Sequence, residues 1–156
     1  MKRKLLISVI GGHKNNVKVD SLAHNIGKII AKVGGIVVCG GLYGVMEAVS
    51  RGSKEAKGTT IGLIPGRDKK DANPYIDIVI PTTIGYARNA MVACSGDIII
   101  ALPGSHGTLS EICYGFVYGK PIIDMGNWKL KGMIKVKGLK GLEEKLKELI
   151  KKMGFK

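Results

Sequence analysis

The chain has 156 residues, of which 45% are hydrophobic, and this composition excludes a disordered or collagen-like chain and fits one globular domain over residues 1–156. Its formal net charge is +13, from 25 Lys and Arg against 12 Asp and Glu, so candidate partners are polyanions, anionic membranes and small phosphorylated ligands. Aromatic residues make up 5% of the chain, which argues against a base-stacking surface for RNA or single-stranded DNA.

Short apolar runs alternate along the chain with segments of helical spacing. The runs of strand length are Leu5–Ile10, Gly35–Cys39, Thr60–Ile64, Ile76–Ile80, Ile98–Leu102 and Pro121–Asp124. They are continuously apolar, which is typical of strands covered on both faces. The segments with helical spacing are Val17–Val33, Val45–Lys57, Tyr86–Ser95 and Thr108–Tyr118. This alternation predicts a doubly wound α/β fold, with a mainly parallel Rossmann-like sheet of about six or seven strands and helices on both faces.

The first residues imitate the start of a signal peptide, because basic residues precede a short apolar run. The run Leu5–Ile10 is too short for a signal peptide, and the Gly11-Gly12-His13 that follows it is not a cleavage site. We therefore expect Leu5–Ile10 to be a first buried strand. Since no apolar run approaches about 18 residues, we expect no membrane span.

Three cysteines, Cys39, Cys94 and Cys113, are widely spaced in apolar surroundings. Their number and spacing are typical of small buried residues in a reduced, cytoplasmic protein, not of a disulfide framework or a zinc site. No His, Cys or carboxylate residues show the spacing of metal ligands, so we expect no metal. The absence of Gln, with plentiful Lys and Ile, suggests a thermophilic source.

Glycine follows three of the predicted strands, and these positions meet at one edge of a parallel sheet. A glycine loop that leads into a helix presents free N–H groups and the positive end of the helix dipole, which together suit a phosphate. One such loop would be explained by the backbone of a tight turn alone, but three at one edge predict a small anionic ligand. The residues are Gly11, Gly12, Gly40, Gly41, Gly44, Pro103, Gly104, Ser105, His106, Gly107 and Thr108.

Two common nucleotide-binding motifs are missing from the sequence. It contains neither G-x-G-x-x-G nor G-x-x-x-x-G-K-[ST], which excludes a nicotinamide-dependent dehydrogenase and a Walker-type NTPase. The segment Thr108-Leu-Ser-Glu111 fits a capping box, with Thr108 at the N-cap of a helix and Glu111 at its third residue. A capping Thr would also place its hydroxyl and amide beside a bound phosphate.

The C-terminal segment carries more than half of the positive charge. Residues 129–156 hold ten Lys and three Glu (+7), whereas residues 1–128 hold fifteen basic and nine acidic groups (+6). An amphipathic helix is predicted at about 139–153, with its apolar side formed by Leu142, Leu146, Leu149, Ile150 and Met153. We interpret its basic side as a solvated face or a subunit contact. Because no recognition motif accompanies the charge, we do not expect nucleic acid as a partner.

Residues 103–111, Pro-Gly-Ser-His-Gly-Thr-Leu-Ser-Glu, resemble the P-G-G-x-G-T-x-x-E motif of the LOG (Lonely guy) family of cytokinin riboside 5′-monophosphate phosphoribohydrolases. These proteins, once labelled lysine decarboxylases, belong to the SLOG superfamily of Rossmann-like nucleotide-binding proteins. Residues 40–46 resemble that family's G-G-x-x-G-x-M loop, and Arg88 precedes Glu111 by 23 residues, the spacing expected of its catalytic Arg and Glu. The resemblance covers about residues 4–125.

The resemblance implies that Gly104, Gly107 and Thr108 bind the 5′-phosphate of a nucleoside monophosphate such as AMP, and that Arg88 and Glu111 are catalytic. The reaction would be hydrolysis of the N-glycosidic bond to a free base and ribose 5-phosphate, without a further cofactor. A carboxylate beside the anomeric carbon stabilises an oxocarbenium-like state and can orient or deprotonate a water. A guanidinium can hold that carboxylate or bind phosphate and sugar oxygens.

Met46 and Asn89 lie in the resembling segments, and we expect both to contact the ligand. Plant-type enzymes have Arg-Lys where this chain has Arg88-Asn89, and Ser105 replaces the second glycine of the motif. Residues 83–91, Thr-Ile-Gly-Tyr-Ala-Arg-Asn-Ala-Met, are more similar to a smaller prokaryotic branch that includes relatives of molybdenum-cofactor carrier proteins. The alternative function is therefore a non-catalytic carrier or sensor of a nucleotide or of a molybdopterin-like phosphorylated cofactor. The resemblance also implies a homodimer or a higher homo-oligomer.

Overall fold

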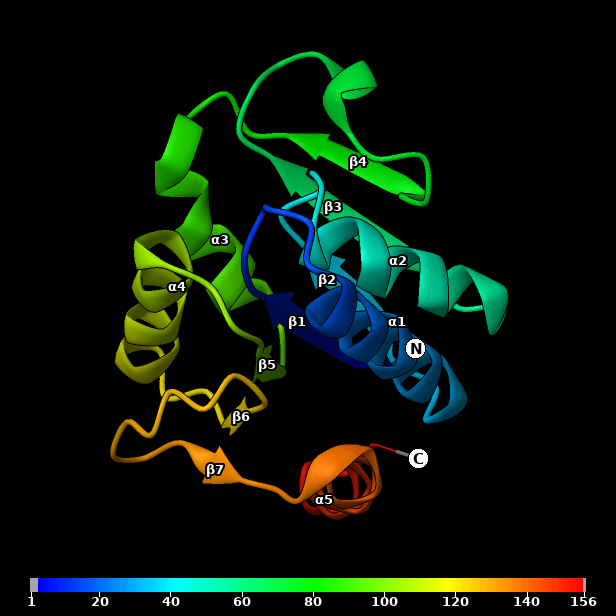
Figure 1. Ribbon diagram of the computed structural model, residues 1–156, viewed down its shortest axis with the longest axis vertical. Coiled ribbons are helices and arrows are strands. Elements are labelled where there is room, and N and C mark those ends of the chain that lie inside the picture. Colours follow the sequence, from blue (N-terminus) through cyan, green and yellow to red (C-terminus); the bar gives the residue numbers. More distant parts are fainter. Residues whose placement is uncertain (1–2, 156) are drawn as a thin grey trace.

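The computed structural model describes residues 3–155, which form one seven-stranded sheet flanked by helices (Figure 1). The strands are β1 (Leu6–Ile10), β2 (Ile36–Cys39), β3 (Thr60–Ile64), β4 (Ile78–Pro81), β5 (Ile98–Ala101), β6 (Ile122–Asp124) and β7 (Ile134–Lys135). The α-helices are α1 (Val17–Lys32), α2 (Val45–Glu55), α3 (Arg88–Ser95), α4 (His106–Val117) and α5 (Gly138–Lys152). Two short 3₁₀ helices are η1 (Lys69–Asp71) and η2 (Gly85–Ala87).

The strand order in the sheet is β4-β3-β2-β1-β5-β6-β7, and every neighbouring pair is parallel. From β1 the chain builds outward to β4, then returns to add β5 on the other side of β1 (Figure 1). The order therefore reverses between β1 and β5. In an open parallel sheet, such a reversal leaves a crevice at the carboxyl ends of the two strands, where ligands bind.

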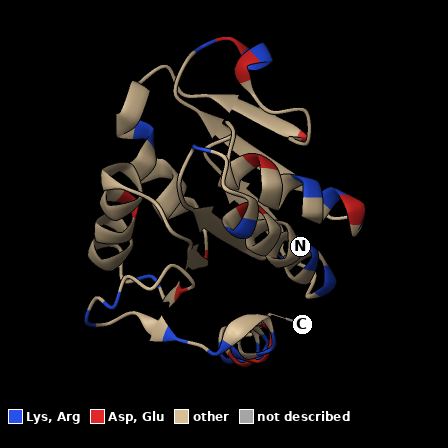
Figure 2. Ribbon diagram, viewed as in Figure 1, with Lys and Arg blue, Asp and Glu red and all other residues tan. Residues whose placement is uncertain are grey.

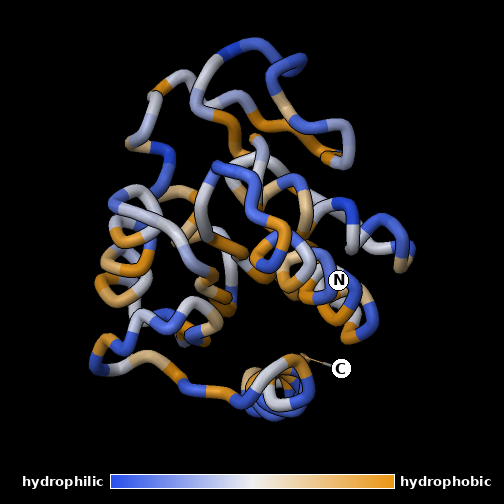
Figure 3. The backbone as a smooth tube through the Cα atoms, viewed as in Figure 1, coloured by the Kyte–Doolittle hydropathy of each residue, from blue (hydrophilic) through white to orange (hydrophobic). Residues whose placement is uncertain are grey.

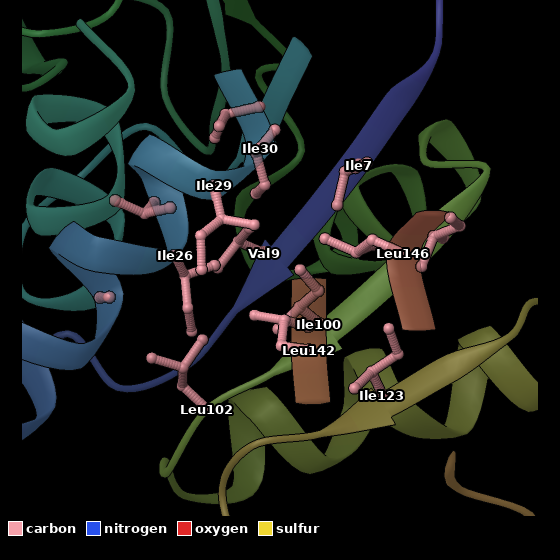
Figure 4. Close-up of a cluster of buried hydrophobic side chains, with 14 of the residues drawn as sticks. Ile7, Val9, Ile26, Ile29, Ile30, Ile100, Leu102, Ile123, Leu142 and Leu146 are labelled. Carbon is pink, nitrogen blue, oxygen red and sulfur yellow. The ribbon is translucent and has the colours of Figure 1, made fainter. Parts of the chain in front are cut away.

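Helices cover both faces of the sheet, which confirms the predicted doubly wound architecture. On one face, α1, α2 and α5 pack on alternate strand residues, and Figure 4 shows Ile26 of α1, Val9 of β1, Ile100 of β5 and Leu142 of α5 in this cluster. The other face is covered by α3 and α4, whose contribution includes the buried Ile112. Side chains in a strand alternate between faces, so the continuous apolar runs supply both clusters.

Helices α1 and α2 touch through their backbones at two glycines. A Cβ atom added to Gly27 of α1 would lie 2.1 Å from the carbonyl oxygen of Val49, and one added to Gly52 of α2 would lie 1.9 Å from that of His24. Both distances are far shorter than any real Cβ contact, so each position accepts only glycine at this separation. These glycines fix how closely the two helices lie on the sheet.

The structure corrects two burial predictions. Strand β4 is an edge strand, and its residues Ile78 and Ile80 are exposed on one side, although the sequence predicted cover on both faces. Cys39 is buried, but Cys94 of α3 and Cys113 of α4 are exposed, because they lie on the outer surface of these helices. An apolar sequence context does not distinguish an inner from an outer helix face when both carry apolar residues.

The outer surface of α3 and α4 is apolar and carries no charge. The only Asp, Glu, Lys or Arg residues within the two helices are Arg88 and Glu111, and both are buried. Apart from these two buried residues, the ribbons of α3 and α4 are tan in Figure 2, and Figure 3 shows apolar segments on this side of the molecule. We call it the α3–α4 surface; its exposed members are Met91, Cys94, Cys113, Tyr114, Phe116, Val117 and Tyr118.

The predicted C-terminal helix is present as α5, with Leu142 and Leu146 buried against the sheet and α1. Its predicted apolar side is only partly covered, since Met153 is exposed. Two ion pairs follow the helical spacing of α5. Lys147 pairs with Glu143, four residues before it, at 2.7 Å, and Glu148 pairs with Lys145, three residues before it, at 2.6 Å. Among the residues that the structure describes, none of the helices has the length and apolar character needed to cross a membrane.

Candidate functional site

The loops that follow β1 and β5 are bonded to each other at the point where the strand order reverses. The Gly12 amide donates to the Pro103 carbonyl oxygen at 2.9 Å, and the Gly12 carbonyl oxygen accepts from the Val45 amide at 3.0 Å. Gly12 therefore links the loop after β5 to the first residue of α2. The three glycine loops that the sequence placed at one edge of the sheet are in contact.

Gly104 lies directly beneath the side chain of Thr108. A Cβ atom at position 104 would lie 2.0 Å from Thr108 Oγ1 and 3.0 Å from the Gly12 amide nitrogen. Any side chain there would displace the hydroxyl or separate the two loops. Thr108 is itself buried, with 3% of its surface exposed, so its hydroxyl is fixed beside the backbone of this loop.

Three helices begin directly after the three glycine loops, and they differ in how far their first N–H groups are occupied. In α1, the Asn16 side chain accepts hydrogen bonds from the amides of Lys18 and Val19, and Asp20 lies in the first turn. Helix α2 has no side-chain cap but carries Glu47 in its first turn. Helix α4 has neither a side-chain cap nor an acid in its first turn. Its free N–H groups and uncompensated dipole make α4 the best suited of these three helices to an anion.

The predicted capping box at residues 108–111 was wrong. Helix α4 begins at His106 with Ser105 as its N-cap, three residues earlier than the N-cap that the motif suggested. Thr108 is therefore the third helical residue, and Glu111 lies in the second turn, where its carboxyl cannot reach back to the N-cap amide. Glu111 is buried instead, with 6% of its surface exposed.

A buried ion pair connects α3 to α4 beside these loops. Arg88, the first residue of α3, has 7% of its surface exposed, and its Nη1 lies 3.9 Å from Glu111 Oε1. Its Nη2 donates to the Gly40 carbonyl oxygen at 3.3 Å, while its buried Nε has no hydrogen-bond partner within residues 3–155. An unpaired donor of a buried cation is costly, so this arginine is held in place against its own stability.

Burial governs the ionisation of this pair. Burial raises the pKa of Glu111 to about 8, although the nearby Arg88 charge acts in the opposite direction. A carboxyl group with a pKa near neutrality can both hold and release a proton under physiological conditions. The guanidinium has five N–H donors and no acceptor, so it can bind phosphate or sugar oxygens without giving up its proton.

Asn89 and Ser110 link the ion pair to the first turn of α4. Arg88 Nη1 donates to Asn89 Oδ1, and Asn89 Nδ2 donates to Ser110 Oγ at 3.2 Å. Ser110 Oγ donates in turn to the Gly107 carbonyl oxygen at 2.6 Å. The motif had suggested no role for Ser110, and no sequence signal connects residues 21 positions apart.

Of the other predicted site residues, Met46 lies close to Arg88, whereas two glycines lie in tightly packed parts of the loops. Met46 lies near the ion pair, because a Cβ atom at Gly40 would lie 2.7 Å from the Met46 sulfur and 2.5 Å from Arg88 Nη2. Gly11 and Gly41 are each required by close packing. A Cβ atom at Gly11 would meet the Val45 side chain at 2.8 Å, and Gly41, with φ of +75°, packs on the backbone of β3.

The other positions surround the start of α4 and the loop before α2. Ser105, His106 and Gly107 are exposed at the free end of α4, and Gly44 is the N-cap residue of α2 with φ of +64°. In the described part of the chain, no three His, Cys, Asp or Glu side chains are grouped so that they could hold a metal ion.

Comparison with known proteins identifies relatives over almost the whole chain. Residues 4–152 match the model of the SLOG cluster4 family. A protein of Archaeoglobus fulgidus named "uncharacterized protein" is 34% identical over 137 residues, which cover 88% of this chain and 87% of that protein. The cytokinin riboside 5′-monophosphate phosphoribohydrolase LOG5 of Arabidopsis thaliana is 38% identical over 79 residues, which cover 49% of this chain and only 35% of that enzyme.

A solved structure matches the fold closely. The molybdenum cofactor binding protein from the phototrophic bacterium Rippkaea orientalis superposes with a TM-score of 0.90 and 31% identity. The superposition covers 96% of this chain and 99% of that one. The likeness therefore extends over nearly the whole length of both chains.

Proposed function

The chain belongs to the SLOG cluster4 family, within the SLOG/LOG superfamily, and on that premise we propose that it binds a nucleoside 5′-monophosphate or a similar phosphorylated ligand at the start of α4. The observation that carries this proposal is the buried Arg88–Glu111 pair, which lies beside an uncapped helix N-terminus where the strand order reverses. A buried charge pair with an unpaired donor, next to a free helix end, combines the features of an anion site and of a reactive site.

The phosphate would bind to the first turn of α4. The amides of Gly107 and Thr108 and the Thr108 hydroxyl would act as donors, and Gly104 would allow the phosphate to approach the backbone. The Arg88 guanidinium would contact a phosphate or ribose oxygen with one of its Nη donors. Backbone donors together with one guanidinium suit a phosphate monoester better than a neutral ligand.

We propose hydrolysis of the N-glycosidic bond as the chemistry of the site. The bond between C1′ and the base nitrogen would break, the water hydroxyl would bond to C1′, and the remaining proton would leave with the base. Glu111 can serve both steps, because its raised pKa lets the acid protonate the departing base and the carboxylate then stabilise the cationic sugar. Arg88 would hold the Glu111 carboxyl in place.

The proposal is tested by incubating the protein with AMP, GMP, CMP and IMP and measuring the free base. We expect release from at least one purine nucleotide, and release that is lost in Glu111→Ala. Binding of a nucleotide without any release would contradict the hydrolytic claim and leave the binding site in place. No binding of any of the four nucleotides, or of inorganic phosphate, would contradict the site itself.

Three variants locate the phosphate. Thr108→Val, which removes the hydroxyl at constant shape, is expected to weaken AMP binding about tenfold or more, and Thr108→Ser to keep it. Asn16→Ala is the matched control at the start of α1, because it removes a side-chain oxygen that its own helix already uses. It should cost about 1 kcal/mol of stability and leave AMP binding unchanged. Calorimetry and denaturant unfolding measure the two effects.

A second candidate is a carrier or sensor that binds a phosphorylated ligand without cleaving it. The superposition with the molybdenum cofactor binding protein favours this candidate, since it covers nearly the whole of both chains. Mass spectrometry of the purified protein distinguishes the two functions. An intact ligand that remains bound through purification, together with unchanged affinity in Glu111→Ala, supports the carrier, whereas recovery of a free base supports the hydrolase.

A further inference from the structure

Asn89 is buried between two helices and is bonded at both ends of its amide. It follows Arg88 in the first turn of α3, and 5% of its surface is exposed. Its Oδ1 accepts from Arg88 Nη1, and its Nδ2 donates to Ser110 Oγ at 3.2 Å. Because Ser110 Oγ donates to the Gly107 carbonyl oxygen at 2.6 Å, a continuous chain of hydrogen bonds runs from the guanidinium to the first turn of α4.

The chemistry of the two partners determines the orientation of this amide. Arginine has donors only, so the Asn89 oxygen must face Arg88 and the Asn89 nitrogen must face Ser110. The Ser110 hydroxyl uses its single proton on the Gly107 carbonyl and can only accept from Asn89. Both polar atoms of Asn89 are thus engaged by the protein, and the amide links Arg88 to Ser110 in one orientation.

We propose that Asn89 is a positioning residue that holds the Arg88 guanidinium in a fixed place relative to the first turn of α4. The inference rests on the proposed function, in which that turn binds the phosphate and the guanidinium contacts the same ligand. It revises the expectation that Asn89 itself touches the ligand. Such a link keeps two donor groups from different helices at the separation that one phosphate ester needs.

A neutral amide suits this position better than a charged side chain. An Asp at position 89 would bring a second carboxylate beside Glu111 and would compete with it for Arg88. A Lys would press a second cation against the guanidinium and has no acceptor to offer it. The Asn89 oxygen accepts from Arg88 without neutralising it, so the charge of Arg88 remains available to Glu111 and to an anionic ligand.

The link is tested first in the protein without ligand. The exchange of the Arg88 Nε proton with water is measured by NMR, and the resonance is identified by its loss in Arg88→Lys. Asn89→Ala is expected to speed this exchange about tenfold or more, because the guanidinium loses a fixed partner. Ser110→Ala removes the partner of the Asn89 amide nitrogen and leaves the bond between Asn89 and Arg88 possible. It should act in the same direction, which keeps the test usable if Asn89→Ala does not fold.

The control is Ser95→Ala, also on α3. The Ser95 hydroxyl donates to the Met91 carbonyl oxygen at 2.7 Å, a bond of the same kind as that of Ser110, but it lies outside the link. Its removal should leave the exchange of the Arg88 proton unchanged. An unchanged exchange rate in Asn89→Ala and Ser110→Ala would overturn the proposal, whether or not the protein binds AMP.

The effect on the ligand is measured by calorimetry with AMP. Asn89→Ala is expected to weaken binding about tenfold, and the double variant Asn89→Ala/Ser110→Ala to bind no more weakly than Asn89→Ala, because both changes break one link. Effects that multiply would overturn the proposal, since they would mean two independent contacts. If the wild type binds neither AMP nor phosphate while exchange is faster in the variants, the proposed function is contradicted and the link is confirmed.

Discussion

Glu111 shows how strongly a single position can depart from what its local sequence suggests. The Thr-x-x-Glu pattern predicted a carboxyl that caps the start of a helix, yet the residue is buried and faces Arg88. The helix begins two residues before the motif, which moves Glu111 from the cap into the second turn. A buried acid with a raised pKa costs stability, and such departures are concentrated at functional sites.

The pH dependence of stability provides a test at this residue. The pKa of Glu111 in the folded protein, about 8, lies above its ordinary value of 4.5, so the folded state binds a proton that the unfolded state has lost between these values. Its contribution to stability is fully present below pH 4.5 and is lost as the pH rises through 8. Glu111→Gln, which cannot ionise, should therefore gain stability relative to the wild type as the pH rises.

Denaturant unfolding of both proteins from pH 5 to about pH 9 measures this difference, and all other titrating groups cancel in the comparison. We expect near-equal stability at pH 5 and an advantage of more than about 1 kcal/mol for Glu111→Gln at pH 9, the equivalent of at least one pKa unit. A constant difference across this range would show that the pKa of Glu111 is not raised.

The sequence indicated Arg88, Glu111 and the loop from Pro103 to Thr108 through a motif, but it did not indicate how they are connected. The bond between Asn89 and Ser110 depends on the packing of α3 against α4, which neither helix encodes alone. Likewise, the glycine pattern did not distinguish Gly11, which is required by packing, from Gly104, which lies in the site. Local sequence patterns indicate where the candidate site lies, whereas its hydrogen bonds depend on how the helices pack against each other.

At the scale of whole elements, the contact between α1 and α2 depends on two glycines. Gly27→Ala or Gly52→Ala would force a methyl group into the backbone of the neighbouring helix, and each is expected to cost about 2 kcal/mol or more. Gly141→Ala in α5 is the matched control, because its nearest neighbour would lie at an ordinary 3.6 Å. It should gain up to about 1 kcal/mol from helix propensity.

Thermal and denaturant unfolding of the three variants measures these changes. A Gly27→Ala variant as stable as Gly141→Ala would show that the two helices can separate without penalty. All three substitutions occur within α-helices and add the same methyl group. The comparison therefore separates the cost of the steric clash from the gain in helix propensity.

Most elements could be predicted from the apolar pattern, because strands buried on both faces stand out from amphipathic helices. The apolar pattern failed for strands whose pairing or burial depends on their place in the folded sheet. It missed β7, a two-residue strand between lysines that exists only through its pairing with β6. It also treated β4 like the inner strands, since Ile78 and Ile80 are apolar whether or not a helix covers them.

At the scale of the whole molecule, charge and apolar surface occupy different places. The basic residues of the C-terminal segment lie on β7 and α5 and the loops beside them (Figure 2), whereas the α3–α4 surface has no exposed charge because Arg88 and Glu111 are buried. Two copies with a net charge of +13 repel each other, and this repulsion is weakest where no charges face each other. An apolar, uncharged surface on such a protein is suited to a second copy of the same chain.

We therefore predict a homodimer or a larger homo-oligomer formed through the α3–α4 surface. Val117→Lys, on α4, should shift sedimentation toward the monomer by placing a charge in the contact. Val17→Lys, on α1, is the control, because Val17 is 88% exposed and Val117 is 77% exposed. Sedimentation that is unchanged in Val117→Lys, or equally changed in both variants, would contradict this interface.

The net charge raises one further question, which is whether an anion binds at the glycine loops or among the lysines. A cavity of about 380 Å³ between β6, β7 and α5 is lined by Lys129 and Lys135 and could attract anions by charge alone. Titration with AMP, followed by backbone amide NMR, separates the two sites most directly. We predict the largest saturating shifts at Gly104, Gly107 and Thr108, together with a shift of the Arg88 Nε resonance. Shifts confined to residues 129–138, or no saturating shift anywhere, would contradict the account.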